Sequence, residues 1–348
     1  MKAITLRHHG GPEVLTLEEL PDLAPGPGEV RVQVRACALN RLDLWVRRGL
    51  PHLRLTYPFI LGADVAGVVD GVGAGVRGVK DGDEVVLSPG VACGRCGECL
   101  AGRDNLCRDY GILGETRDGG YAEQIVVPAV NVVPAPKGLT WAERAAPLLT
   151  YLTVWQMLVK KARLQPGETV LVHAAGSGIG VAAIQVAKLF GAEVIATARS
   201  DDKLDRARAL GADHAVLSDD DLVAQVRRLT GKRGVQVVVE HTGAQTWPQS
   251  ILACARGGRI VTCGATSGFD ARTDLRHVFF RQLTIFGSTM GSKGDLYEFL
   301  PHLEDRRLRS VIDRIYPLAE ARTAHEHLEG RHQFGKIVLT LPEPVSAG

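Results

Sequence analysis

The chain has 348 residues, a formal net charge of +2, and 45% hydrophobic and 23% charged residues. This length allows about two domains with their own cores, and the near-neutral charge gives no electrostatic reason to expect a nucleic acid or an anionic membrane as partner. The first residues, MKAITLRHHGG, lack the apolar core of a signal peptide, and no apolar run reaches the roughly 18 residues that span a bilayer. We therefore expect a cytoplasmic protein.

Short strands separated by Pro/Gly turns are predicted from residue 1 to about residue 133. Val30, Val32 and Val34 alternate with polar residues, which is the two-residue period of a half-exposed strand. Further strand candidates are residues 59–69, 84–87 and 122–127. This texture predicts a β-rich, barrel-like first domain.

Four cysteines stand close together in this region. They are Cys93, Cys96, Cys99 and Cys107, spaced by two, two and seven residues. Four thiolates at this spacing can surround one zinc ion in a closed site, which would stabilise a loop and leave no position for substrate. A disulfide-linked or empty loop is the alternative; an iron–sulfur cluster fits the spacing less well. The separate residues Cys37, Cys254 and Cys263 are expected to be buried, inert thiols.

A nucleotide-binding βαβ unit is predicted over residues 168–199. The β-branched run Val170–Val172 precedes a turn with three glycines, a helical repeat follows, and a second strand is predicted at 194–198. The glycines permit a tight turn, close approach of a pyrophosphate and helix–strand contact, and the helix N-terminus attracts the anion. We expect the turn residues to bind the dinucleotide: Gly176, Ser177, Gly178, Ile179 and Gly180.

Strands alternate with helices through the rest of the second domain, which predicts a parallel, doubly wound sheet. The segments that carry this pattern are 204–210, 222–229, 235–240, 251–255, 259–263 and 283–287. A helix is predicted around 296–303 and a closing strand at 336–340. His173 and His241 lie at predicted strand ends, where we expect satisfied core histidines.

The end of the second strand of the βαβ unit bears on the choice of cofactor. NAD enzymes place an acid there to bind the ribose hydroxyls. This chain instead has Arg199, Ser200 and Lys203, which can bind a 2′-phosphate. The pattern favours NADPH; NAD is the alternative if Arg199 is only a solvated surface residue.

The β-rich first part, the cysteine loop and the glycine turn together resemble the medium-chain dehydrogenase/reductase superfamily. The segments AAPLL at 145–149, VTCGATSG at 261–268 and FGKIV at 334–338 extend the likeness. The resemblance implies an α/β architecture, with a GroES-like β-barrel catalytic domain at 1–152 that carries a zinc lobe at 89–110. A Rossmann domain would follow at 153–289, and residues 290–348 would return to the catalytic domain. It also implies a homodimer or homotetramer, with the cofactor in the cleft between domains.

The resemblance implies further contacts to the cofactor. Those residues are Thr153, Thr242, Gly264, Ala265, Phe286, Ser288 and Lys336.

Alcohol dehydrogenases of this superfamily hold a second, catalytic zinc, and this chain departs from their ligand pattern. Asn40 stands where the first cysteine would be, Ala63 replaces the histidine, and Thr150 stands near the third ligand. Amide, methyl and hydroxyl groups do not form a zinc site. Asp43 and Asp64 remain as oxygen ligands but are a poor cage by themselves. We expect no catalytic zinc.

The Leu-Asn-x-x-Asp segment at 39–43 and the glycine turn are similar to the zinc-independent quinone oxidoreductase branch. That likeness implies reduction of a quinone or α,β-unsaturated carbonyl by NADPH. Catalytic roles are predicted for Asn40, Asp43 and Thr150. Asn40 can donate to a carbonyl as negative charge develops, or only order a turn. Asp43 is expected to orient neighbouring backbone more than to act as a general acid, and Thr150 is a weaker donor candidate. His52 and Tyr57 are weaker donor candidates.

Three functions stay open on the sequence. The first is an NADPH-dependent reductase of quinones, enones or similar carbonyl substrates without catalytic zinc. The second is a zinc-containing alcohol dehydrogenase for small alcohols, aldehydes or ketones. The third is a nucleotide-binding protein without turnover.

Overall fold

The computed structural model describes residues 1–51 and 53–342. The chain divides into two compact units. Unit 1 comprises Met1–Leu149, Ser292–Asp305 and Ser310–Gly348, and unit 2 comprises Thr150–Gly291 and Arg306–Arg309. Among the described residues, no helix is long and apolar enough to cross a membrane.

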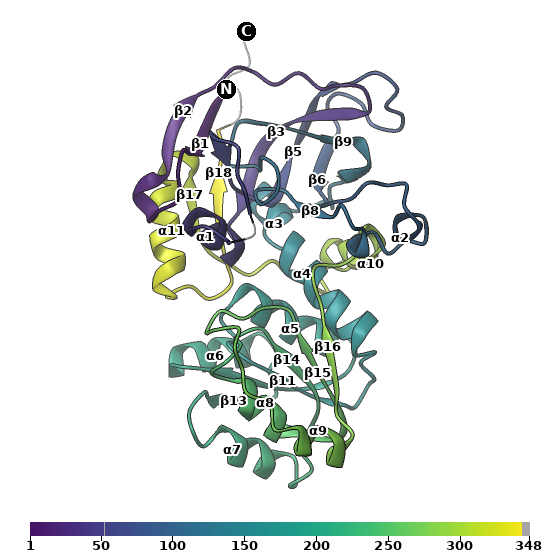
Figure 1. The fold of residues 1–348 in the computed structure, drawn as a ribbon, viewed down its shortest axis with the longest axis vertical. Coiled ribbons are helices and arrows are strands. Elements are labelled where there is room, and N and C mark those ends of the chain that lie inside the picture. Colours follow the sequence, from purple (N-terminus) through teal and green to yellow (C-terminus); the bar gives the residue numbers. More distant parts are fainter. Residues whose placement is uncertain (52, 343–348) are drawn as a thin grey trace. The chain divides into compact units, whose positions relative to one another are not determined.

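Unit 1 is built on a seven-stranded sheet with the order β10-β6-β5-β3-β18-β17, in which β9 also pairs with β3. A three-stranded sheet, β2-β1-β4, lies beside it in Figure 1. The strands of unit 1 are β1 (Lys2–Leu6), β2 (Thr16–Glu19), β3 (Glu29–Ala38), β4 (Phe59–Ile60), β5 (Asp64–Val72), β6 (Glu84–Leu87), β7 (Gly90–Val91), β8 (Gly111–Ile112), β9 (Gln124–Pro128), β10 (Val132–Pro134), β17 (Ile312–Pro317) and β18 (Lys336–Thr340).

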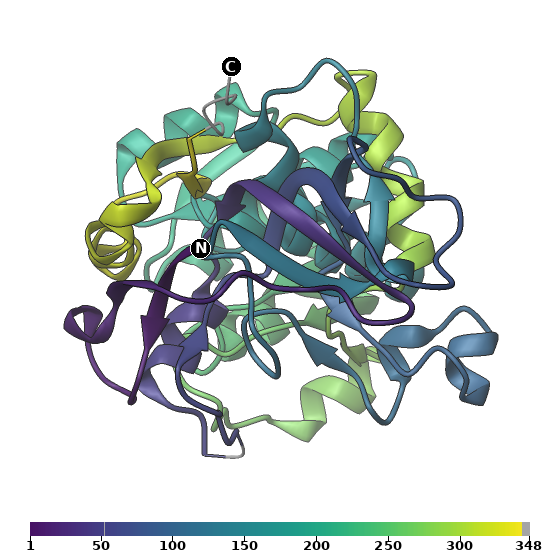
Figure 2. The ribbon, with the colours of Figure 1, turned by 90° about the horizontal axis from the view of Figure 1, so that it is seen from above.

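The helices of unit 1 are short, and α4 (Leu148–Trp155) contains the division between the units. The others are α1 (Arg41–Arg48), α2 (Gly97–Leu100), α3 (Trp141–Ala145), α10 (Lys293–Glu304) and α11 (Ala321–Gly330), with 3₁₀ turns η1 (Pro12–Val14), η2 (Asp104–Leu106), η3 (Ala129–Asn131) and η5 (Leu318–Glu320). In Figures 1 and 2 the segment that carries α2 extends away from the large sheet.

Strand β3 is the centre of the unit 1 sheet because it pairs with three other strands. Its alternating valines, Val30, Val32 and Val34, are buried in the core, as the two-residue period predicts. The expected single strand over 59–69 is instead two strands, β4 and β5, interrupted at residues 61–63. Gly62 there has φ +104°, and a Cβ on it would lie 2.5 Å from the Tyr121 ring, so only glycine fits this bend.

Unit 2 is a six-stranded parallel sheet with the order β13-β12-β11-β14-β15-β16. Its strands are β11 (Thr169–Val172), β12 (Glu193–Ala198), β13 (His214–Leu217), β14 (Val235–Glu240), β15 (Cys254–Thr262) and β16 (Thr284–Gly287). Its helices are α5 (Gly178–Leu189), α6 (Asp201–Ala209), α7 (Leu222–Leu229), α8 (Trp247–Ala253) and α9 (Leu275–Arg281), preceded by a π-helical segment, η4 (Gln156–Lys161).

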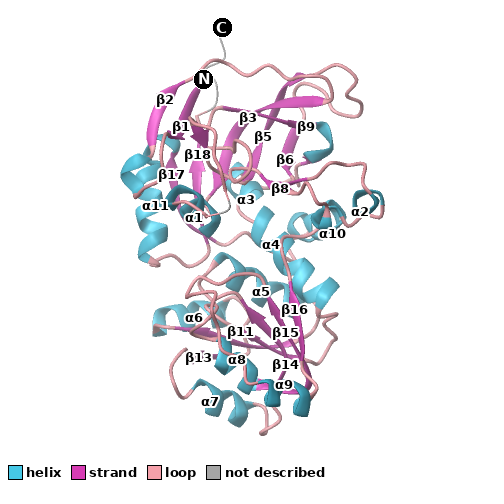
Figure 3. Cartoon of the chain, in the orientation of Figure 1, coloured by secondary structure: helices cyan, strands magenta, loops and turns pink. Residues whose placement is uncertain are grey.

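Helices cover both faces of this sheet, which confirms the doubly wound prediction. Figure 3 shows α5 and α6 on one side of the strands, with α7 and α9 on the other. Residues of α7 and α8 pack with Leu171, Ile195 and Val238 in one core cluster. The direction of winding reverses between β11 and β14, and such a switch point opens a ligand crevice at the carboxyl ends of the strands. The predicted segment 251–255 spans the end of α8 and the start of β15.

Candidate active site

The glycine turn of unit 2 joins β11 to α5 at the carboxyl edge of the sheet. Ser177 caps the helix, because its Oγ accepts a hydrogen bond of 2.9 Å from the Gly180 amide. A Cβ on Gly180 would lie 2.4 Å from the Ala174 carbonyl oxygen, so the helix can start this close to the turn only with glycine there. The residues therefore fit a pyrophosphate at a helix N-terminus, and they would hold it through backbone amides.

The same turn is tied to the end of β12. The amides of Ala175 and Ala174 donate to the carbonyl oxygen and to Oγ1 of Thr197, at 2.8 and 3.3 Å. Strand β12 ends at Ala198, and Arg199 and Ser200 follow as exposed residues. Two acids, Asp201 and Asp202, then occupy the first turn of α6. Arg199 thus lies at the sheet edge where a ribose would be recognised, with carboxylates directly after it.

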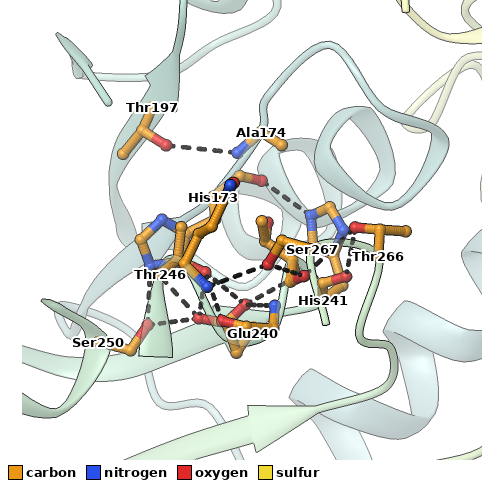
Figure 4. Close-up of polar contacts among 12 residues, drawn as sticks. His173, Ala174, Thr197, Glu240, His241, Thr246, Ser250, Thr266 and Ser267 are labelled. Atoms are coloured by element: carbon orange, nitrogen blue, oxygen red, sulfur yellow. Dashed lines mark hydrogen bonds and ion pairs between the residues drawn. The ribbon is translucent and has the colours of Figure 1, made fainter. Parts of the chain in front are cut away.

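A second polar group at this edge surrounds Glu240, the last residue of β14 (Figure 4). Its buried carboxylate accepts hydrogen bonds from the amides of Thr242 and Gly243, at 2.7 and 3.0 Å. It also accepts from the hydroxyls of Thr246, at 2.9 Å, and Ser250, at 2.6 Å. Glu240 therefore fixes the loop after β14, in which Thr242 was predicted to contact the cofactor.

Two histidines complete this group, and their partners fix their tautomers. The Ser250 hydroxyl donates to Glu240, so it accepts from the Nε2–H of His173, 2.9 Å away. His241 Nε2 lies 2.9 Å from the His173 carbonyl oxygen, which can only accept. Burial lowers the pKa of His173, which keeps the ring neutral. Figure 4 shows both rings turned inward among these groups, and they tie β11 to β14.

The other predicted cofactor residues of unit 2 lie on α4 or near the carboxyl edge of the sheet. Thr153, on α4, is buried, and its hydroxyl lies 3.9 Å from the Met290 sulfur. Gly264 and Ala265 follow β15. Phe286 lies in β16, and Ser288 comes directly after that strand. Their contact with a cofactor stays a prediction.

Lys336 is placed differently, because it belongs to β18 of unit 1. Lys336 is 3% exposed, and its ammonium donates to Asn40 Oδ1 at 2.5 Å and to Asp64 Oδ2 at 2.8 Å. The Asn40 amide in turn donates to Asp64 Oδ2 at 2.9 Å, and Asp64 Oδ1 accepts from the Leu149 amide at 2.7 Å. Lys336 therefore belongs to a buried network of unit 1, and its contact with the dinucleotide stays a prediction.

Asp43 anchors the other side of Asn40. Its Oδ2 accepts from the backbone amide of Asn40 at 2.6 Å and from the Tyr121 hydroxyl at 3.2 Å, and its Oδ1 accepts from the backbone amide of Gly62 at 3.2 Å. Burial raises the pKa of Asp43 to about 7, and the hydrogen bonds from Asn40 and Tyr121 and the Lys336 charge oppose the shift. Burial also raises the pKa of Asp64.

This donor set does not suit a catalytic metal. The amide oxygen of Asn40 and one oxygen of Asp64 already bind the Lys336 ammonium, so a metal ion would have to displace a buried cation. Ala63 is buried and has no donor atom, and Thr150 is a buried residue of α4 in unit 2. Tyr57 is 38% exposed, with its ring edge-on to His9, and His52 lies outside the described residues.

The cysteine loop does suit a metal. The Sγ atoms of its four cysteines lie within 4.8 Å of one another, and those of Cys93 and Cys99 are 3.9 Å apart. Tetrahedral zinc with thiolate bonds of about 2.3 Å needs sulfurs about 3.8 Å apart. Within residues 1–51 and 53–342, no other group of three His, Cys, Asp or Glu side chains is arranged to share an ion. These cysteines would hold zinc, which would supply a structural cross-link.

Of the three isolated cysteines, Cys37 and Cys254 are buried as expected, whereas Cys263 is only half-buried. Burial raises the pKa of Cys37, and it raises that of Cys254 to about 11 and that of Cys263 to about 12. Sequence reasoning missed several buried polar residues near Asp43 and in unit 2, because no local pattern marks them. They are Arg47, Tyr121, Glu240, Ser250 and His325.

Comparison with known proteins places the chain in a family. Residues 26–137 match the alcohol dehydrogenase GroES-like domain, and residues 178–305 match the zinc-binding dehydrogenase domain. A solved structure described as an NAD-dependent alcohol dehydrogenase is 54% identical, with a TM-score of 0.96 over 98% of this chain and 100% of that one.

Two further relatives differ in their described activities. The quinone oxidoreductase of Pseudomonas aeruginosa is 32% identical over 97% of this chain and 99% of its own length. The crotonyl-CoA carboxylase/reductase of Cereibacter sphaeroides is 30% identical over 98% of this chain and 87% of its own length. With both domain families matched and likeness along almost the whole chain, the protein belongs to the medium-chain dehydrogenase/reductase superfamily and is an NAD(P)-dependent oxidoreductase.

Proposed function

We propose that the protein transfers hydride from NAD(P)H to a quinone, an enone or a similar conjugated carbonyl, without a metal at the reacting centre. The observation that carries this proposal is the Lys336 ammonium bound to Asn40 and Asp64. A buried organic cation thus contacts Asn40, at the first metal-ligand position of alcohol dehydrogenases, and Asp64, next to Ala63 at the second. Relatives described as quinone oxidoreductase and as crotonyl-CoA carboxylase/reductase support this substrate class, since both names denote reduction of conjugated systems.

The bound dinucleotide supplies the hydride, and the residues of the chain bind the dinucleotide and polarise the substrate carbonyl. The turn at Ser177–Gly180 would hold the pyrophosphate. Asn40 would donate from its amide to the substrate carbonyl oxygen, using the N–H that Asp64 does not take. Because the Lys336 ammonium binds the oxygen of the same amide, it draws electron density from the nitrogen and makes its N–H groups stronger donors. Thr150 is retained as a weaker donor candidate.

For the cofactor we propose NADPH, with the Arg199 guanidinium on the 2′-phosphate and Ser200 and Lys203 nearby. The absence of an acid at the end of β12 supports this choice. Two observations favour NADH as a second candidate: Asp201 and Asp202 would repel a phosphate, and the relative that is 54% identical is described as NAD-dependent.

The alternative reaction is zinc-dependent oxidation of a small alcohol, which the description of that same relative favours. The test measures zinc content together with turnover. If no metal acts at the reacting centre, we expect one zinc per chain, held by the cysteine loop. NADPH or NADH should then be oxidised with quinones and enones, at a rate that brief chelation does not change. Two zinc ions per chain, with alcohol oxidation lost to a chelator and restored by zinc, would establish the alternative.

A further inference from the structure

Arg47 is a fully buried arginine at the end of α1, 0% exposed. Its Nη1 lies 3.0 Å from Nδ1 of His325, a residue of α11, and its Nη2 donates to Glu329 on the same helix. His325 Nε2 lies 3.2 Å from the Tyr121 hydroxyl, which lies 3.2 Å from Asp43 Oδ2. A chain of contacts thus runs through the interior of unit 1 from Glu329 to Asp43.

The direction of every hydrogen bond in this chain is determined. A guanidinium can only donate, so His325 Nδ1 must accept from Arg47 and carries no proton. Burial, together with the Arg47 charge, lowers the pKa of His325 to about 3, so the ring is neutral and its proton is on Nε2. That N–H donates to the Tyr121 oxygen, and the Tyr121 hydroxyl donates to Asp43. The three bonds from Arg47 to Asp43 point toward the Asp43 carboxylate, and the bond from Arg47 to Glu329 points away from it.

We propose that Arg47, His325 and Tyr121 form a one-way hydrogen-bond relay that holds Asp43 ionised and oriented, so that Asp43 can position Asn40 and Gly62 for the reaction. The inference rests on the proposed function and assigns positioning roles to Tyr121 and His325. Asp43 is the shared anchor, because one oxygen accepts from the backbone amide of Asn40 and the other from the backbone amide of Gly62, two residues before Asp64.

The relay predicts how activity depends on pH. The charged or titratable groups that face Asp43 are Cys37 on β3, Asp64 on β5, Tyr121, and Lys336 on β18, with His325 of α11 and Arg47 of α1 behind Tyr121. A protonated Asp43 has one acceptor fewer, so kcat/KM should fall as pH drops through about 7. The Tyr121 hydroxyl stabilises the ionised Asp43 carboxylate. Removing this hydroxyl should therefore move the low-pH fall of kcat/KM to higher pH.

The decisive variant is Tyr121→Phe, and the chain offers a matched control. Tyr316 of β17 also bonds a histidine of α11, with its hydroxyl 3.0 Å from His327 Nδ1 and the rings edge-on as in the Tyr121–His325 pair. Tyr316→Phe should keep the parent pH profile. Tyr121→Phe should lower kcat/KM about tenfold at pH 7, which is the value of one hydrogen bond to a charged group. The low-pH fall of kcat/KM should move to higher pH, and the affinity for NADPH should not change. A low-pH fall that stays at the parent pH in Tyr121→Phe would overturn the relay.

A second pair of variants guards against misfolding. His325→Gln keeps an acceptor for Arg47 and a donor for Tyr121, whereas His325→Leu keeps neither. We expect His325→Gln to keep most of the parent kcat and His325→Leu to lose it. Circular dichroism should show that both variants are folded. Equal loss in the two would assign His325 to packing alone and contradict the relay.

The hydrogen-bond direction can be tested without turnover, which separates this inference from the proposed function. ¹⁵N NMR of the histidine-labelled protein, assigned with His325→Gln, distinguishes a protonated ring nitrogen from a bare one. We expect His325 to be neutral, with the proton on Nε2, from pH 6 to pH 8. A proton on Nδ1 would refute the relay, whereas the expected tautomer without any reductase activity would refute only the proposed function.

Discussion

The residues that define the candidate site are charged groups in places where charge is costly. Asp64 is 0% exposed and Lys336 is 3% exposed, and each is stabilised by the other and by Asn40. Removing one partner of such a pair leaves an uncompensated buried charge, which costs more than the pair itself contributes. The network therefore holds the three side chains in one arrangement.

Lys336→Met should accordingly destabilise unit 1 by about 3–5 kcal/mol, because the Asp64 carboxylate loses its cation. The double variant Lys336→Met/Asp64→Asn, which removes both charges, should recover part of that loss. Urea unfolding measures the free energy of unfolding of both variants and of the parent protein. If the single variant were as stable as the parent, the Lys336 ammonium could not be bound to Asp64 as described.

Arg199 decides cofactor preference if the proposed 2′-phosphate contact is correct. Arg199→Asp should weaken NADPH binding by about tenfold or more and change NADH binding little, since only the phosphate is repelled. The matched control is Arg228→Asp, the same charge change on an exposed residue in the last turn of α7. That turn leads into the amino end of β14, away from the carboxyl edge. Equal losses for both dinucleotides in fluorescence titrations would count against NADPH.

At the scale of elements, the turn between β11 and α5 depends on one close approach. A side chain on Gly180 would meet two backbone carbonyl oxygens, those of Ala174 and Ala175, at 2.4 and 2.7 Å. Backbone cannot yield as a flexible side chain can, so the helix start would have to move. The backbone amides that would bind the dinucleotide belong to that same turn.

Gly180→Ala should therefore weaken NAD(P)H binding by about tenfold or more and lower stability by about 1–3 kcal/mol. The contrasting variant is Gly294→Ala in the first turn of α10, where a Cβ would meet only Ser292 Oγ at 3.5 Å. There the helix should gain about 0.5–1 kcal/mol and dinucleotide binding should not change. Calorimetry measures the stability of the two variants, and titration measures their affinity for NAD(P)H. If Gly180→Ala changed neither quantity, the turn could accommodate a Cβ at residue 180.

At the scale of the whole molecule, the cysteine loop is joined to a distant part of unit 1. Asp104 begins η2, three residues before Cys107, and accepts hydrogen bonds from both the amide and the ammonium of Lys293, at 3.0 and 3.1 Å. Lys293 is the first residue of α10, so zinc in the loop would also steady the start of that helix.

Cys107→Ser should reduce zinc from one per chain to well below one and lower the melting temperature, because a structural zinc site contributes directly to folding. Cys263→Ser, which changes a cysteine outside the loop, should retain the full zinc content. Metal analysis and thermal unfolding read out both variants. Full zinc in Cys107→Ser would mean that the four thiols do not share an ion.

The sequence alone predicted the features whose parts are close together in the chain. The glycine turn and the cysteine loop each occupy fewer than 20 residues, and the valine alternation of β3 fewer than 10, so spacing and period reveal them. The doubly wound sheet followed from the order of such local segments.

The polar networks were decided only by tertiary structure. Asn40 and Lys336 are 296 residues apart, and Tyr121 and His325 are 204 apart, so no local pattern can indicate that they are bonded. The family resemblance implied a cofactor contact for Lys336, but only the fold shows that its ammonium binds Asn40 and Asp64. Burial made the difference: inside unit 1 each polar atom needs a partner, and the fold alone determines which partners are within reach.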